Sequence, residues 1–133
     1  MVKLVLIRHA RVSTAELPGV YASADALLLT FGKLAFTRYV LPAKLTSYMA
    51  AGKPILVAGD GAAAELVKRV GCGASVSSGD FAGLADEVQK IARRPLQEKE
   101  EMGNKGRDYA KKAFDRSSYY ARLVKELQSL AKK

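Results

Sequence analysis

The stretch LPAKLTSYMAAGKPILVAGDG, Leu41–Gly61, decides the fold of this chain. Pro42 suits the first turn of a helix, where its missing N–H costs no hydrogen bond. Apolar side chains then recur at spacings of three and four, at Leu45, Tyr48 and Met49. This spacing places them on one face of a helix. The first half of the stretch therefore predicts a short amphipathic helix.

The second half of the stretch predicts a helix end, a strand and a glycine turn. Gly52 ends the helix, because glycine adopts the left-handed conformation without steric cost. Pro54 makes the preceding residue extended, and Ile55–Val57 then reads as a buried strand. Gly59–Gly61 turns the chain into the next helix. Helix, strand and helix in this order indicate a parallel α/β sheet, in which ligands bind at the carboxyl ends of the strands.

The remaining elements are predicted from the same patterns. Further strands are expected at Lys3–Arg8, Ala26–Phe31 and Ala74–Ser77. Further helices are expected within Val12–Ala24, Ala62–Val70, Phe81–Arg93, Leu96–Phe114 and Ser117–Lys133, and a loop at Gly32–Val40. Alternating strands and helices predict one α/β domain over residues 1–133. We expect a three-layer Rossmann-like domain with a mostly parallel sheet of about four strands and C-terminal helices.

Composition narrows the classes of function. The 133 residues include one Cys and one His, so the chain can form no internal disulfide and build no metal site from these residue types. No apolar run reaches the length of a membrane span, and the N-terminus is too charged for a signal peptide, which predicts a cytoplasmic protein. The formal charge of +9 suggests an anionic partner. No nucleic-acid-binding motif is present, so nucleic acid ranks low among the candidates.

One segment of the chain carries basic residues and no acids. Between Asp25 and Asp60 the charged residues are all basic: Lys33, Arg38, Lys44 and Lys53. Lys44 falls in the first turn of its predicted helix, where the helix dipole disfavours a cation. A residue placed against its local electrostatics is a candidate partner for the charge of an anionic ligand. The alternative is that these are solvated surface residues, and the sequence leaves both readings open.

Four separate blocks of sequence occur in the order found in one enzyme family. They are ASADALLLTF, PAKLTSYMAAGKPILVAGDGAAAELVKRVGCG, SSGDFAGLADEVQKIA and MGNKGRDYAKKAFD. Together they resemble the C-terminal domain of retaining glycosyltransferases of group 1 (family 4), which have two Rossmann-like domains. The resemblance covers Glu16–Phe114. It is closest to the transferases of cell-wall and surface-polysaccharide synthesis, in which a Pro-x-Lys opens the helix, as at Pro42 and Lys44.

The resemblance implies a binding site for the nucleoside diphosphate of a sugar donor, with no metal and no cofactor besides the donor. Lys44 and the Gly59-Asp60-Gly61 turn would then lie near the diphosphate and the sugar. Glu65 would lie on the flanking helix. Ser47 stands where the family usually has the Glu that holds the ribose. With Arg38 from the basic segment, the candidate residues are Arg38, Lys44, Ser47, Gly59, Asp60, Gly61 and Glu65. Catalytic residues are not identified.

Two strands and an acceptor domain precede the matching domain in the family. We expect this chain to lack them and therefore to transfer no sugar by itself, since catalysis needs both substrates in one cleft. One alternative is a non-catalytic binding or partner subunit that works with an acceptor domain on another chain. The missing strands would leave an edge of Ala26–Phe31 open. Either Lys3–Arg8 pairs with this edge within the chain, which gives a monomer, or a second copy pairs with it, and we expect a homodimer. An anionic membrane surface is a further candidate partner.

A second, short resemblance lies at the N-terminus. LVLIRHA is similar to the opening of histidine phosphatases, in which Arg8 would bind phosphate and His9 would be the nucleophile. That family needs a second histidine, and His9 is the only one in the chain. Phosphatase chemistry is therefore the weaker alternative. Cys72, between two glycines, reads as a small turn residue, because no His or Asn partner can be assigned to it.

Overall fold

The computed structural model describes residues 5–8 and 10–131. The strands of the sheet are β1 (Leu27–Thr30), β2 (Ile55–Ala58) and β3 (Gly73–Val76). The helices are α1 (Leu17–Ala22), the 3₁₀ helix η1 (Ala35–Tyr39), α2 (Ala43–Ala51), α3 (Ala62–Val70), α4 (Phe81–Arg93), α5 (Leu96–Ala113) and α6 (Arg116–Ala131).

The sheet is parallel, with the strand order β1-β2-β3. Leu28, Leu56 and Ala74 are partners in the register, one from each strand. Helix α2 connects β1 to β2 and helix α3 connects β2 to β3, as parallel neighbours require. The predicted α/β class is therefore confirmed, with three strands in the described part of the chain rather than about four.

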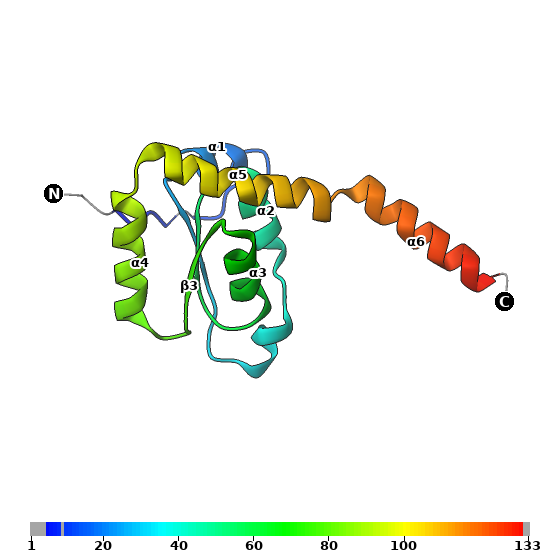
Figure 1. Ribbon diagram of the computed structural model, residues 1–133, viewed down its shortest axis with the longest axis horizontal. Coiled ribbons are helices and arrows are strands. Elements are labelled where there is room, and N and C mark those ends of the chain that lie inside the picture. The colour runs from blue at the N-terminus through cyan, green and yellow to red at the C-terminus, as the bar shows by residue number, and fades with distance from the viewer. Residues whose placement is uncertain (1–4, 9, 132–133) are drawn as a thin grey trace.

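Helices lie on both sides of the sheet. In Figure 1, β3 runs between α4 on one side and α3 on the other, and α5 crosses one end of the domain. Ile55 and Val57 of β2 belong to the main core cluster. This cluster also contains Leu45 and Met49 of α2 and, from α3, Ala63, Ala64, Leu66 and Val67. Leu56, also buried, alternates to the opposite face of the sheet, where α4 contacts β2 and β3.

Two glycines allow α5 to approach α2 closely. A Cβ at Gly103 would collide with the carbonyl oxygen of Gly52, which follows the last turn of α2. A Cβ at Gly106 would lie 3.1 Å from the Cβ of Cys72. Both glycines are buried. The lack of side chains at these two positions therefore allows α5 to pack closely against the rest of the domain.

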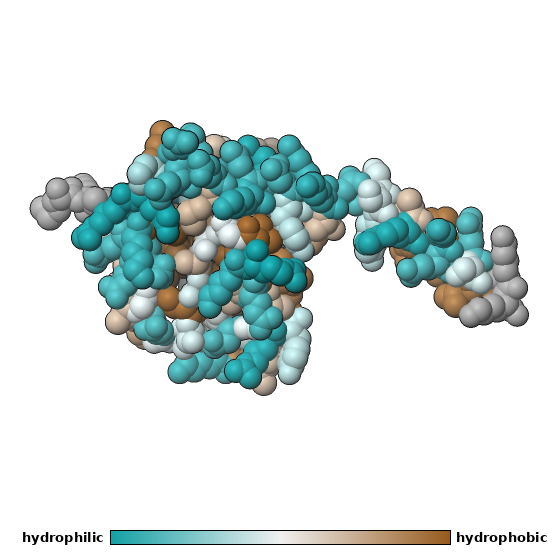
Figure 2. All heavy atoms as spheres, viewed as in Figure 1, coloured by the Kyte–Doolittle hydropathy of each residue, from teal (hydrophilic) through white to brown (hydrophobic). Residues whose placement is uncertain are grey.

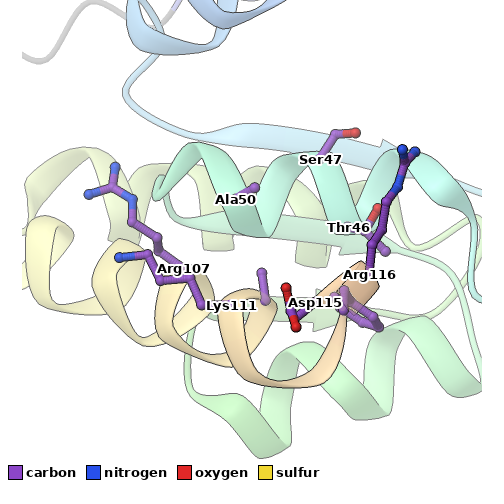
Figure 3. Close-up of a pocket in the computed structure, with 9 residues that line it drawn as sticks. Thr46, Ser47, Ala50, Arg107, Lys111, Asp115 and Arg116 are labelled. Atoms are coloured by element: carbon purple, nitrogen blue, oxygen red, sulfur yellow. The ribbon is translucent and has the colours of Figure 1, made fainter. Parts of the chain in front are cut away.

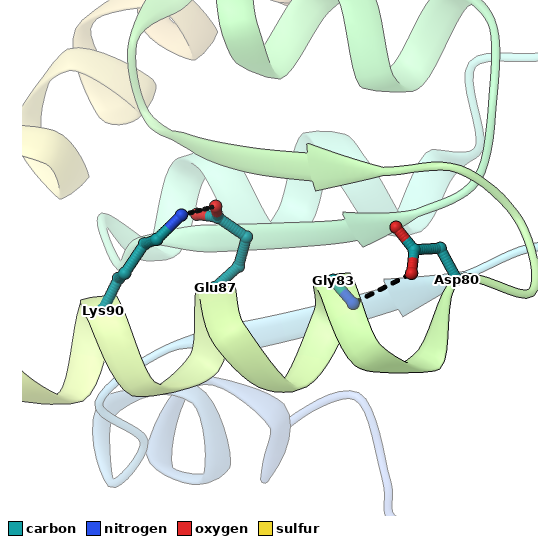
Figure 4. A network of polar contacts seen from close by, with 4 residues as sticks. All are labelled: Asp80, Gly83, Glu87 and Lys90. Carbon is teal, nitrogen blue, oxygen red and sulfur yellow. Dashed lines mark hydrogen bonds and ion pairs between the residues drawn. The ribbon is translucent and has the colours of Figure 1, made fainter.

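The helix ends match the sequence signals. Gly52 (φ 70°) and Gly71 (φ 73°) are left-handed and end α2 and α3, and the stop at Gly52 was predicted. Asp80 caps α4, because its carboxylate accepts a 2.9 Å hydrogen bond from the Gly83 N–H (Figure 4). One helical turn further on, Lys90 pairs with Glu87 at 2.7 Å. Such an exposed pair adds little stability.

The prediction of a first strand at Lys3–Arg8 is wrong where the structure describes it. Val5–Arg8 forms no strand, and Leu6 is 80% exposed. Lys3 and Leu4 lie outside the described residues. An apolar run becomes a strand only where a sheet edge pairs with it and a layer covers it, and Val5–Arg8 is paired with no strand.

The short helix expected within Val12–Ala24 is found at Leu17–Ala22. Just before this helix, Ser13 donates its Oγ–H to the Glu16 carboxylate at 2.6 Å. The predicted loop Gly32–Val40 contains η1, which the sequence did not indicate.

Helix α6 extends away from the domain (Figure 1). It begins at an aspartate cap, in which Asp115 accepts a 2.8 Å hydrogen bond from the Ser118 N–H. None of its residues is buried. Figure 2 shows apolar side chains along one side of it. The exposed apolar residues of α6 are Tyr119, Tyr120, Leu123, Val124, Leu127 and Leu130.

Candidate functional site

The loops that follow the three strands meet at the carboxyl edge of the sheet, where hydrogen bonds from Ser78 join them. Its Oγ–H donates a 2.8 Å hydrogen bond to the carbonyl oxygen of Phe31, after β1. Its backbone N–H donates to Oδ2 of Asp60, after β2, at 3.4 Å. Ser78 itself follows β3 and is 9% exposed. One serine thus links the ends of all three strands.

Two of the candidate glycines are packed closely at this edge. A Cβ at Gly59 would lie 2.6 Å from Cδ2 of Phe31, so the ring covers this glycine. Gly61 has φ 95°, a conformation that L side chains rarely adopt, and a Cβ there would collide with the backbone of Arg38. Gly61 and Arg38, both predicted site residues, are therefore brought together by the backbone.

The first turns of α2 and α3 open toward this same edge, because each helix in a β-α-β unit runs antiparallel to its strands. Their N-cap residues are Pro42 and Gly61, and neither provides a capping side chain. Asp80 caps α4 and Asp115 caps α6, whereas α5 also starts without a capping side chain, at Pro95. Uncapped N–H groups at a helix start, together with the helix dipole, favour an anion.

Three basic residues lie at this edge of the sheet: Lys33, Arg38, whose backbone lies beside Gly61, and Lys44 in the first turn of α2. Lys33, Arg38 and Lys44 are exposed. The ion pairs found in the described part of the chain are Lys90–Glu87 and Arg94–Glu98, so these three cations have no carboxylate partner there. The stem of Lys33 passes close to Gly79, where a Cβ would lie 3.1 Å from its Cε. Their charges therefore add to the attraction of this edge for an anion.

The seven predicted site residues divide into two groups. Arg38, Gly59, Asp60, Gly61 and Glu65 lie at or beside the loop that leads into α3, and the exposed Glu65 is in the first turn of that helix. Lys44 and Ser47 lie on α2, with Lys44 in its first turn. Ser47 lines a groove between α2, α5 and the start of α6, together with Arg107 and Arg116 (Figure 3). None of Gly59, Asp60, Gly61 or Glu65 lines that groove.

Two features of the carboxyl edge were not predicted from the sequence. Ser78 was not singled out, although its SSGD surroundings already marked a turn after a strand. Helix η1 presents exposed aromatic side chains next to Arg38: Phe36, and Tyr39 at 86% exposure. No apolar periodicity identifies a segment of this kind, because its side chains face solvent rather than a core.

The structure does not show a reactive nucleophile at either Cys72 or His9. Burial raises the pKa of the Cys72 thiol from 9.0 to about 11, which keeps it protonated and unreactive at neutral pH. His9 lies outside the described residues, and Arg8 is exposed.

Across residues 5–8 and 10–131, no group of three or more His, Cys, Asp or Glu side chains could hold a metal ion. No helix within this part of the chain has the length and apolarity needed to cross a bilayer.

Comparison of the chain with known protein families, with curated proteins and with solved structures found no match.

Proposed function

We propose that this domain binds the nucleoside diphosphate of a sugar donor at the carboxyl edge of its sheet, as the donor half of a glycosyltransferase in cell-surface polysaccharide or glycoconjugate synthesis. In this proposal the phosphates lie at the starts of α2 and α3, and Lys44 and Arg38 contribute positive charge. The acceptor is held by a second domain.

One observation carries the proposal. The helices that follow β1 and β2 both start at this edge without a capping side chain, and the basic residues around them lack carboxylate partners in the described part of the chain. Parallel α/β sheets bind phosphates at such helix starts. The identity of the sugar donor as the ligand rests on the resemblance of Glu16–Phe114 to the family 4 transferases.

A non-catalytic partner subunit is the second candidate function. The exposed apolar face of α6 favours it, because a helix of this kind is typical of a surface that another chain covers. In that case the domain still binds the nucleotide sugar, and a separate chain provides the acceptor site.

Calorimetric titration with nucleoside diphosphates and nucleotide sugars tests the proposal. We expect binding by the wild type and a loss of roughly 1–3 kcal/mol of binding free energy in Lys44→Ala, the range for a charge-assisted hydrogen bond. Lys68→Ala is the matched control, since Lys68 is also an exposed lysine but lies in the last turn of α3. Equal affinity in both variants would remove Lys44 from the site. Absence of binding to every nucleotide would refute the proposed function.

A further inference from the structure

The groove beside Ser47 has features that the proposed function does not use. It lies between α2, α5 and the first residue of α6, and its volume is about 640 Å³ (Figure 3). This volume is in the range of small-molecule sites. Its polar lining consists of two hydroxyl residues, three cations and one acid: Thr46, Ser47, Arg107, Lys111, Arg116 and Asp115.

The guanidinium of Arg107 is held in place at one end of the groove. Its Nη2 donates a 3.1 Å hydrogen bond to the carbonyl oxygen of Ala51, in the last turn of α2. Gly52 makes room for it, because a Cβ there would collide with Nη2 of Arg107. A carbonyl accepts this bond without neutralising the charge, so Arg107 remains available to an anion. Lys111 follows one helical turn later on the same face of α5.

The positive charges of the groove are not matched by acids. Arg107, Lys111 and Arg116 form no ion pair with any residue that the structure describes. The one carboxylate in the lining, Asp115, accepts the Ser118 N–H at the start of α6. That hydrogen bond lowers the pKa of Asp115, which therefore stays ionised as a helix cap. The lining has three cations and one acid, so the groove carries an excess of positive charge.

We propose that this groove binds the phosphate groups of an anionic ligand. Figure 3 shows Arg107 and Lys111 next to each other at one end, and Arg116 beside Thr46 at the other. Two separated groups of donors fit a ligand with more than one anionic oxygen cluster, such as a diphosphate. The hydroxyl of Thr46 lies at the Arg116 end, and the Asp115 carboxylate lies between the two groups of cations. This site is additional to the one proposed at the starts of α2 and α3, and it does not depend on that proposal.

Calorimetric titration with pyrophosphate at low salt tests the groove. The test variant is the double substitution Lys111→Ala and Arg116→Ala. The matched control is Lys112→Ala with Arg122→Ala, which removes the same charge from the same two helices at exposed positions outside the groove. We expect the test variant to bind roughly tenfold more weakly or worse than wild type. The control should keep most of the affinity.

Two outcomes overturn the proposal. If the test and control variants lose affinity equally, pyrophosphate binds through the overall positive charge of the chain rather than in the groove. If the wild type binds neither pyrophosphate nor anionic vesicles, the groove is not an anion site. The Lys44→Ala variant separates this site from the one at the carboxyl edge, since Lys44 does not line the groove. A result that excludes one of the two proposed sites therefore does not exclude the other.

A second arm identifies the source of the phosphate. The protein is sedimented with vesicles of phosphatidylcholine, with and without a third of phosphatidylglycerol. Binding only to the anionic vesicles, lost in the test variant and retained in the control, assigns the groove to a lipid headgroup. Pyrophosphate binding that requires Lys111 and Arg116, without such vesicle binding, assigns it to a free phosphate compound. Both results support an anion site in the groove.

Discussion

The hydroxyl of Ser78 donates a 2.8 Å hydrogen bond to the carbonyl oxygen of Phe31, which joins the loop after β3 to the loop after β1. The strand between them, β2, ends at Ala58, and Gly59 lies beneath the Phe31 ring. The two edge strands are thereby connected across the end of the central strand. This connection fixes the loops from which a ligand at the carboxyl edge would be bound.

Removing this hydroxyl should destabilise the domain. In Ser78→Ala the Phe31 carbonyl loses its side-chain partner at a nearly buried position, and we expect the free energy of unfolding to fall by about 1–2 kcal/mol. Urea unfolding followed by circular dichroism measures the change. Ser77→Ala is the control, because Ser77 is exposed and its side chain forms no hydrogen bond with residues 5–8 or 10–131. A loss of the same size in both variants would show that the hydrogen bond is not the cause.

Placing a methyl group at Gly103 should separate α5 from α2. The new Cβ would collide with the Gly52 carbonyl oxygen, and forcing extra volume into a packed contact costs about 1–3 kcal/mol. Gly19→Ala is the matched control, because no atom lies within 4 Å of a Cβ at that position in α1. Alanine is the better helix former, so the control should be neutral or slightly more stable. Thermal unfolding of both variants tests this contrast. An unchanged melting temperature in Gly103→Ala would contradict the close contact.

The sequence predicted the elements that follow from periodicity and from chain breakers. Helix α3, helix α4 and the glycine end at Gly52 are found where they were expected. Val5–Arg8 was wrongly predicted to be a strand, because its apolar residues resemble those of a strand. Only pairing with a neighbouring strand distinguishes a true strand from an unpaired apolar segment. Local sequence contains no information about that pairing.

The candidate site was predictable only in part. Gly61 and Arg38 are adjacent in the structure, as a shared site requires, but their contact depends on η1, which no pattern indicated. Ser47 was assigned from the resemblance, yet it faces a groove formed with α5 and α6. Which helices meet around a residue is decided by packing between segments that are far apart in the chain. The spacing of residues along one helix does not reveal it.

Cys72 should make the stability of the domain depend on pH above about 9. Burial raises the pKa of its thiol from 9.0 to about 11, so the unfolded chain loses this proton at a lower pH than the folded domain. The stability that the protonated Cys72 thiol contributes is fully present below the pKa of the thiol in the unfolded chain. It is lost as the pH rises toward the pKa of the thiol in the folded domain. The free energy of unfolding should fall by at most about 1.4 kcal/mol per pH unit from this group. Urea unfolding between pH 8 and pH 11 should show a steeper decline for wild type than for Cys72→Ala. Equal slopes would exclude this contribution.

Helix α6 leads to a prediction about assembly. An isolated helix of this length, 16 residues, is marginally stable in water, and none of its side chains is buried in the domain. Its apolar face includes Tyr120, 58% exposed, and Leu127, 57% exposed. Pairing with a second copy would bury this face and stabilise the helix. The edge strand β1, which has β2 as its one partner among the described strands, is a second surface for such contact.

We therefore expect the chain to be a homodimer in solution, with α6 in the interface. Leu127→Glu should shift the protein to monomer, because it places a charge on the apolar face, and the helical signal in circular dichroism should decrease. Lys125→Glu is the control, since position 125 faces the opposite side of the same helix. It should leave the dimer intact. Light scattering across a wide range of concentrations measures both variants and the wild type. A wild type that stays monomeric throughout would exclude the dimer, and a dimer that survives Leu127→Glu would place the interface elsewhere, with the free edge of β1 as the next surface to test.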